Sequence, residues 1–287
     1  MSVFSFTVAI AGIGINFTAP RHMEVPPELK PFLTNSVPIQ ETYEIELIDR
    51  PLVFENKPVF SSCRLAVYAN EDGVTRAFLP LQAPDGCIPA CRMRRNGINT
   101  LYIPANDWQR YERKCTLSTL LGPETLFLRH NGLILHSSIV RYSGQAVLFC
   151  GPSGVGKSTQ AELWERYRNG EILNGDRCVI MKRGDTFFGC GSPYSGSSGV
   201  YKQEEAPIRA IILPEKSLEN RIERIEQGKA FRQLYRELIG NLWDEAFTGK
   251  LLELLHELVL HVPVYHLYCR PEEQAVELTH DAVFGGQ

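Results

Sequence analysis

The sequence predicts an α/β domain preceded by a smaller, β-rich N-terminal domain. Its length of 287 residues suits two domains of about 100–200 residues each. From near residue 116 onward, short apolar runs alternate with segments of helical periodicity, which is the pattern of an α/β fold. Before residue 112 the apolar residues alternate and turn residues are frequent. We therefore assign 1–112 to the β-rich domain and 113–287 to the α/β domain.

The amino-acid composition indicates a globular protein without a general affinity for nucleic acid or membranes. Hydrophobic residues make up 44% of the chain and charged residues 22%, as in a globular protein with an ample core. The net charge of −3 provides no general attraction to nucleic acid or to an anionic membrane, so neither is expected as a partner. The eight cysteines are scattered without the spacing of a disulfide framework, which favours a reducing, cytoplasmic location.

The first seventeen residues carry no charge and alternate in two phases around Ala11 and Gly12. This pattern predicts a half-buried strand with a bulge or bend at that point. An export signal is the weaker alternative, because no basic residue precedes the apolar run.

The rest of the N-terminal domain reads as a small antiparallel module. Residues 43–48 and 64–68 alternate, and 70–73 supply the turn of a hairpin that continues to residue 79. Cys87 and Cys91 have a ligand-like spacing, but no second pair follows to complete a zinc site. The cluster Arg92, Arg94 and Arg95 favours a solvated turn over a docking patch for an acidic or phosphorylated partner.

The α/β domain is expected to begin with a helix over 117–129. Strands follow at 132–140, 146–150, 172–173, 178–181, 186–188, 208–213 and 264–269. A helix is expected to start at 160–164, and others are expected at about 228–242 and 249–261. A last helix is expected to begin with Pro271 at its first position.

One motif in this domain indicates its chemistry. Residues 151–158 read GPSGVGKS and fill every fixed position of G-x-x-x-x-G-K-[ST] between a predicted strand and a predicted helix. Glycines allow successive backbone N–H groups to face one anion, and the helix N-terminus adds its positive dipole end. The motif predicts ATP and Mg²⁺ as cofactors, with Lys157 on the β- and γ-phosphates and the Ser158 hydroxyl on the metal. The expected nucleotide-binding residues are Gly151, Pro152, Ser153, Gly154, Val155, Gly156, Lys157, Ser158 and Thr159.

The stretch LHSSIVRYSGQAVLFCGPSGVGKST resembles the kinase core of HPr kinase/phosphorylase, a branch of P-loop proteins shared with phosphoenolpyruvate carboxykinase. That family has a histidine in the strand before the P-loop strand, where this chain has His136. Asn174-Gly175-Asp176-Arg177 occupies the place of the family's Asp-Asp pair, and 208–212 is similar to its later Ile-Arg-Gly segment. The resemblance spans about 117–280 and is greatest with HPr-kinase-like relatives, some of them associated with modified-peptide biosynthesis.

The resemblance implies an ATP- and Mg²⁺-dependent kinase that transfers the γ-phosphate to a hydroxyl, with serine of a protein or peptide as the expected acceptor. It implies Lys157, His136 and Asp176 as catalytic residues and Ser158 with Asp176 as metal ligands. The chain departs from the family at Gly175, where the first carboxylate of the pair is missing, and with it an obvious general base. Taken alone, His136 on an apolar strand also fits a core histidine.

Several alternatives stay open at this point. The protein could be a small-molecule kinase on the same core, for example of a free amino acid, or an ATP-binding accessory or switch protein with little turnover. The loop at 189–199 could fold over phosphate or substrate, or be a flexible linker. The N-terminal domain, which lacks a catalytic constellation, is expected to present the acceptor or to mediate assembly. The oligomeric state is open, a homo-oligomer included.

Overall fold

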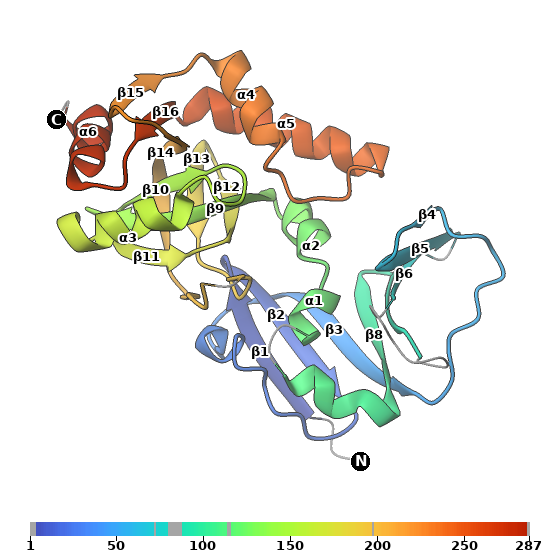
Figure 1. Ribbon diagram of the computed structural model, residues 1–287. Coiled ribbons are helices and arrows are strands. Elements are labelled where there is room, and N and C mark those ends of the chain that lie inside the picture. The colour runs from blue at the N-terminus through green and yellow to red at the C-terminus, as the bar shows by residue number, and fades with distance from the viewer. Residues whose placement is uncertain (1–3, 72, 80–87, 114–115, 197, 286–287) are drawn as a thin grey trace. The chain divides into compact units, whose positions relative to one another are not determined.

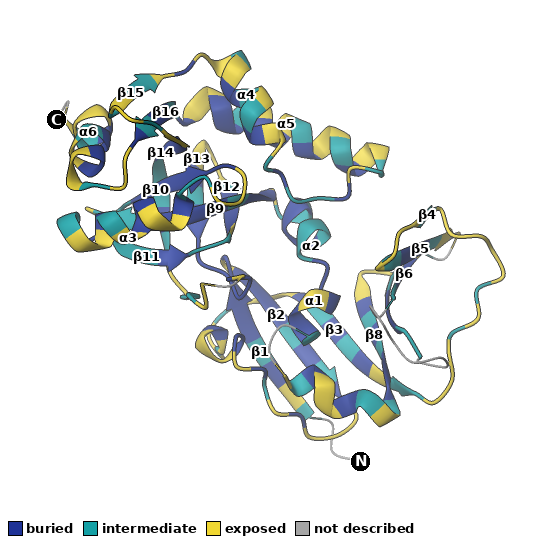
Figure 2. Ribbon diagram, in the orientation of Figure 1, coloured by how far each residue is buried: buried dark blue, intermediate teal, exposed yellow. Residues whose placement is uncertain are grey.

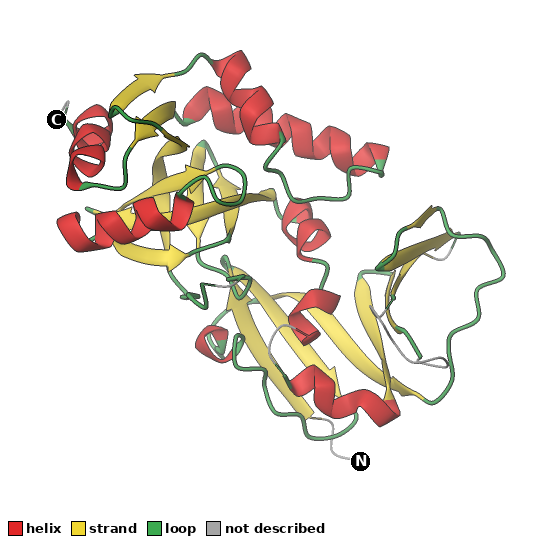
Figure 3. Cartoon of the chain, in the orientation of Figure 1, coloured by secondary structure: helices red, strands yellow, loops and turns green. Residues whose placement is uncertain are grey.

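The chain forms two compact units, Met1–Pro123 and Glu124–Gln287, each built on an eight-stranded sheet. We describe them from a computed structural model, which covers residues 4–71, 73–79, 88–113, 116–196 and 198–285 (Figure 1). Together the units contain both helices and strands in a mixed α/β fold (Figure 3). The division falls after Pro123 rather than after residue 112.

The first unit contains eight strands in the order β1-β2-β3-β8-β7-β6-β5-β4. They are β1 (Phe4–Ile10), β2 (Ile13–Ala19), β3 (Ile39–Ile48), β4 (Phe60–Ser61), β5 (Leu65–Asn70), β6 (Gly73–Phe78), β7 (Ala90–Arg95) and β8 (Ile98–Pro104). The described part of the unit also contains two 3₁₀ helices, Lys30–Phe32 and Ala105–Glu112, and the short helix α1 (Thr116–Leu120).

The N-terminal pattern predicted one bent strand, and the structure has a hairpin. Ala11 and Gly12 both have positive φ, of 53° and 79°, which is the geometry of a two-residue hairpin turn. β1 and β2 therefore pair antiparallel, with Ile10 opposite Ile13. The change of phase in the sequence marked this turn.

The prediction of a purely antiparallel module is wrong, because β3 runs parallel to both of its neighbours, β2 and β8. The solvated turn predicted for the arginine cluster is also wrong, because these residues lie on strand β7 and the turn follows at Asn96 and Gly97. Arg92 is buried, and its guanidinium donates to the carbonyl oxygen of Leu121. Of the Cys87–Cys91 pair, Cys87 lies outside the described residues, as does Asp72 of the predicted hairpin turn.

The second unit's sheet runs β10-β9-β12-β13-β14-β16-β15, with β11 paired to β9. Its strands are β9 (Gly132–Tyr142), β10 (Gln145–Cys150), β11 (Glu171–Asn174), β12 (Arg177–Arg183), β13 (Thr186–Cys190), β14 (Glu205–Lys216), β15 (Arg221–Arg224) and β16 (Val264–Cys269). Its helices are α2 (Pro123–Arg129), α3 (Lys157–Arg168), α4 (Gln227–Tyr235), α5 (Glu245–His261) and α6 (Glu273–Phe284). β10 also pairs with β14, so β9, β12, β13, β14 and β10 form a closed ring of pairings.

Two apolar cores hold the helices to this sheet. One core joins α4 and α5 to one side of the strands, and the other joins α3 and α6 to the other side (Figure 1). Trp164 of α3 is fully buried in the second core, and α5 turns Leu251, Leu255 and Leu258 inward while its other side is exposed (Figure 2). β10, β14 and β16 run parallel, so their carboxyl ends lie at one edge of the sheet.

The predicted strands of this unit are present, β15 was not predicted, and the other differences lie in the helices. The helix predicted over 117–129 is broken into α1 and α2 at Gly122, whose φ is +60°. The helix predicted over 228–242 ends at Tyr235. Pro271 precedes the N-cap Glu272 of α6 instead of opening the helix. Among the described residues, no helix is long and apolar enough to cross a membrane.

Candidate functional site

The loop between β10 and α3 has the backbone geometry that its glycines allow. Gly151, Gly154 and Gly156 have φ of 150°, 80° and 114°, values that residues with a side chain rarely adopt. Around Gly154 and Gly156 an added Cβ would meet nothing within 4 Å, so these two glycines are required for conformation and not for space. The loop is open to an anion, because Pro152, Ser153 and Gly154 are exposed at the N-terminus of α3.

Lys157, the first residue of α3, is folded back onto this loop. Its Nζ donates to the carbonyl oxygens of Gly151 at 2.8 Å and Pro152 at 3.1 Å. The residue is only 7% exposed, and burial lowers the pKa of the ammonium group, an effect opposed by nearby negative groups that include Glu237 and Asp176. The ammonium group therefore lies within the electrostatic reach of two carboxylates.

His136 lies on β9 between this loop and the Asn174–Arg177 turn. On one side its carbonyl oxygen faces the N–H of Gly151 at 3.5 Å, and on the other the N–H of Ser137 donates to the carbonyl oxygen of Asp176 at 3.0 Å. The His136 Nε2 atom is 3.3 Å from Oδ1 of Asp176. The structure thus brings three predicted residues, Lys157, His136 and Asp176, to one edge of the second unit's sheet.

Asn174 builds the turn that carries Asp176. Its side-chain oxygen accepts from the N–H groups of Asp176 at 3.0 Å and Arg177 at 2.9 Å, which closes the turn. Its amide nitrogen donates to the carbonyl oxygens of Ser192 at 3.1 Å and Tyr194 at 3.3 Å. One buried side chain therefore ties the turn to the glycine- and serine-rich loop.

That loop passes very close to the turn. A Cβ on Gly196, whose φ is +53°, would lie 2.3 Å from Oδ2 and 2.8 Å from Cβ of Asp176. A Cβ on Gly175 would lie 2.5 Å from Cβ and Oγ of Ser198. The loop is therefore packed against the turn at these points, and position 175 has no room for a side chain.

Ser158 and Asp176 stay predictions as metal ligands. Ser158 is exposed in the first turn of α3, and the side chain of Asp176 is 29% exposed. Across the described part of the chain, no three His, Cys, Asp or Glu side chains cluster as a metal site. One hydroxyl and one carboxylate still fit Mg²⁺, which usually binds one or two protein oxygens together with waters and substrate phosphates.

The sequence analysis missed Glu237. Its Oε2 atom is 3.4 Å from Nδ1 of His136, and its side chain is only 12% exposed. In the sequence it fell inside the helix predicted over 228–242, where a glutamate reads as a surface charge. Leu238-Ile239-Gly240, which follow it, were a signal in the sequence against that helix, and α4 does end early, at Tyr235.

Three other polar residues of the second unit, Arg209, Glu204 and Glu205, lie in structural contacts. Arg209 donates from Nε to the carbonyl oxygen of Val283 at 3.1 Å. Glu204 pairs with Arg141 at 2.7 Å, and Glu205 accepts two hydrogen bonds from Arg183. The Arg183 bonds hold the pKa of Glu205 below its usual value.

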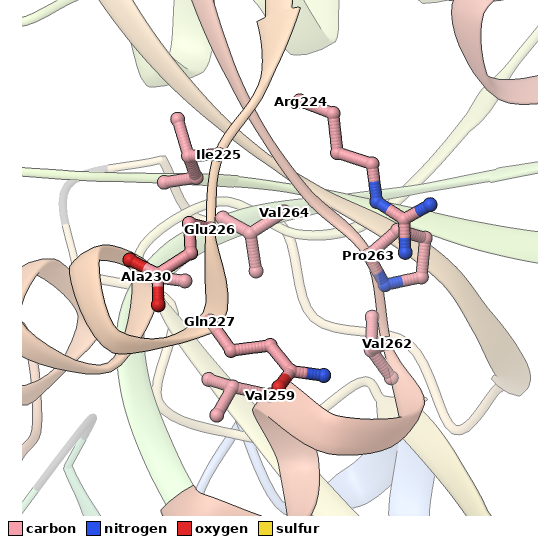
Figure 4. A pocket seen from close by; sticks show the side chains of 9 residues that line it. All are labelled: Arg224, Ile225, Glu226, Gln227, Ala230, Val259, Val262, Pro263 and Val264. Atoms are coloured by element: carbon pink, nitrogen blue, oxygen red, sulfur yellow. The ribbon is translucent and has the colours of Figure 1, made fainter.

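A separate cavity of ≈ 420 Å³ opens between α4 and α5 and contains none of the predicted site residues (Figure 4). Its lining combines the polar Arg224, Glu226 and Gln227 with six apolar side chains. Nothing in its lining belongs to the phosphate loop or to the turn of Asp176.

Comparisons with known proteins give only distant likeness. No protein-family model matches the chain, and no curated protein matches it in sequence. Solved structures give 48 matching chains, among them an HPr(Ser) kinase/phosphatase from Coxiella burnetii. That structure is 13% identical with a TM-score of 0.31, over 52% of this chain and 89% of its own. At these values the likeness does not establish a family.

Proposed function

We propose that the protein is a phosphotransferase that uses Mg-ATP to phosphorylate a hydroxyl group, with serine of a protein or peptide as the acceptor. The observation that supports this most is the convergence of the Gly151–Gly156 backbone, Lys157 and the His136–Asp176 pair at the carboxyl end of β10. A site that only bound Mg-ATP would need the carboxylate for the metal but not the histidine beside it.

Each residue of the site has a separate role in the proposed phosphoryl transfer. Lys157 exchanges its two carbonyl acceptors for phosphate oxygens, and the loop N–H groups and the α3 N-terminus hold the remaining phosphate charge. When bound, Mg²⁺ neutralises charge on the phosphates, and Ser158 and Asp176 are the residues that would hold it. Transfer through a loose transition state depends mostly on such positioning and charge stabilisation, so a single carboxylate in the Asn174–Arg177 turn is compatible with it.

The test is transfer of label from Mg-[γ-³²P]ATP to serine-containing peptides and proteins encoded near the gene, with free serine and threonine in parallel. We expect labelled peptide or protein with the wild type and none with Lys157→Ala. The matched control is Lys250→Ala, which removes an equally charged but exposed residue of α5 and should leave transfer unchanged.

The outcomes separate the alternatives. Label on a free amino acid would indicate a small-molecule kinase instead. Calorimetric binding of Mg-ATP without transfer to any acceptor would indicate an accessory or switch protein. Absence of binding to the folded wild type would refute the nucleotide site itself.

A further inference from the structure

Glu237 is held beside His136 by the backbone as well as by its side chain. The N–H of His136 donates to the carbonyl oxygen of Glu237 at 2.9 Å, and the N–H of Ile239 donates to that of Ile134 at 3.0 Å. Leu238 forms an antiparallel bridge with Leu135 between these two bonds. The segment after α4 therefore runs along β9 as a short additional strand, which fixes Glu237 relative to His136.

The imidazole of His136 lies between two carboxylates. Nδ1 is 3.4 Å from Oε2 of Glu237, and Nε2 is 3.3 Å from Oδ1 of Asp176. A histidine ring is commonly oriented by a carboxylate on the nitrogen that faces away from the reacting groups. Asp176 faces Nε2 and is the residue expected to hold Mg²⁺, so Glu237 on Nδ1 is the carboxylate left to orient the ring.

The charge of Glu237 also reaches the phosphate loop. Together with Asp176 it opposes the burial that lowers the pKa of Lys157, and it adds to the burial that raises the pKa of the Cys150 thiol at the end of β10. Glu237 thus lies close to the loop's lysine as well as to His136. Asp176 shares this placement, because it also lies beside His136 and also opposes the lowering of the Lys157 pKa.

We propose that Glu237 is a positioning residue of the phosphoryl-transfer site, which fixes the His136 ring so that Nε2 faces Asp176. This inference rests on the proposed function. It assigns to Glu237 the second carboxylate that the Asn174–Arg177 turn cannot hold, because a Cβ at Gly175 would collide with Ser198. In this role the carboxylate acts through the histidine.

The test compares Glu237→Gln, which keeps the shape and an acceptor oxygen but loses the charge, with Glu237→Asp, which keeps the charge. The matched control is Glu277→Gln, an exposed glutamate of α6. The probe is hydrolysis of Mg-[γ-³²P]ATP in a single turnover by the full-length protein, with nucleotide affinity measured by calorimetry. We expect Glu237→Gln to lower the rate by about 10²-fold, the cost of a misplaced catalytic group, without a change in affinity. Glu237→Asp should recover part of the loss, and Glu277→Gln should cost nothing.

A double-mutant cycle distinguishes positioning from a general structural role. If Glu237 acts through His136, Glu237→Gln should cost nothing further in a His136→Gln background. A full, additive loss in that background, or a wild-type rate in Glu237→Gln alone, would overturn the proposal.

A spectroscopic arm needs no activity. In the nucleotide-free protein labelled at histidine nitrogens, Glu237→Gln should shift the Nδ1 resonance of His136, and Glu277→Gln should not. If the wild type neither hydrolyses ATP nor transfers phosphate, the proposed function fails, whereas the Glu237–His136 contact is still decided by this resonance. An unchanged resonance would overturn the positioning role.

Discussion

Substitution of Gly196 by alanine tests whether the glycine-rich loop sets the place of Asp176. The left-handed conformation at φ +53° costs a residue with a side chain about 1–2 kcal/mol. The new Cβ would also lie 2.3–2.8 Å from three atoms of the Asp176 side chain, so the carboxyl group or the loop must move. Overpacking of this kind costs about 1–3 kcal/mol more. A displacement of Asp176 by about 1 Å should lower phosphoryl transfer by about 10²-fold.

Gly199→Ala is the matched control for this variant. Gly199 has φ +67° on the same loop, but a Cβ there would meet nothing within 4 Å. Gly199→Ala should therefore show only the cost of placing alanine in the left-handed conformation. Each kcal/mol of this cost lowers Tm by about 2–4 °C in a domain of 150–250 residues. The measurements are thermal unfolding and the labelled-ATP transfer assay on both variants. Equal losses of Tm and of transfer in the two variants would refute the close approach of the loop to Asp176.

Four further predictions concern the site and its surroundings. Lys157→Ala should weaken Mg-ATP binding or make it unproductive, because the loop loses its ammonium group; unchanged affinity and transfer would contradict the phosphate loop. Asp176→Asn should make ATP affinity insensitive to Mg²⁺ in calorimetry. His136→Gln should lower turnover by about 10²–10⁴-fold if the imidazole moves the acceptor proton. Glu171 accepts hydrogen bonds from Lys202 and Arg141, and these lower its pKa from the ordinary value of 4.5. The pairing therefore contributes stability above pH 4.5, and this stability is lost as the pH falls through the lowered pKa. Because Glu171 is about one-third exposed, Glu171→Gln should cost only about 0.5–1 kcal/mol in urea unfolding at neutral pH and nothing in acid; an equal cost at both would refute the linkage.

Periodicity and turn chemistry predicted the elements whose causes are local. The apolar run before Gly151 became β10, and the change of phase at Ala11 and Gly12 marked a turn, although the sequence suggested a bend within one strand. The parallel pairing of β3 with β8 could not be predicted, because partners far apart in the chain are selected by packing and leave no local signal.

The residues of the candidate site that lie in or near the phosphate-loop motif were predicted from the sequence, and the distant one was not. Lys157 follows from a motif, and His136 and Asp176 followed from a resemblance that placed them in flanking segments. Glu237 could not be found in this way, because it lies about 100 residues after His136 in the sequence. It reaches His136 only through the pairing of 237–239 with β9, and β14, β15 and α4 lie between the two segments in the chain. A hydrogen-bonded strand segment made of three residues has no periodicity to detect.

The absence of a side chain at Gly175 is best explained by the loop that covers it. Asn174 holds residues 192 and 194 by hydrogen bonds, which brings the backbone of Gly196 against Asp176 and Ser198 against Gly175. A second carboxylate at position 175 would have to displace Ser198. The loop packing that fixes Asp176 also excludes an acidic side chain at the neighbouring position 175. A second carboxylate must therefore come from another element. Glu237 meets that condition because its backbone is bonded to His136 and not to the turn.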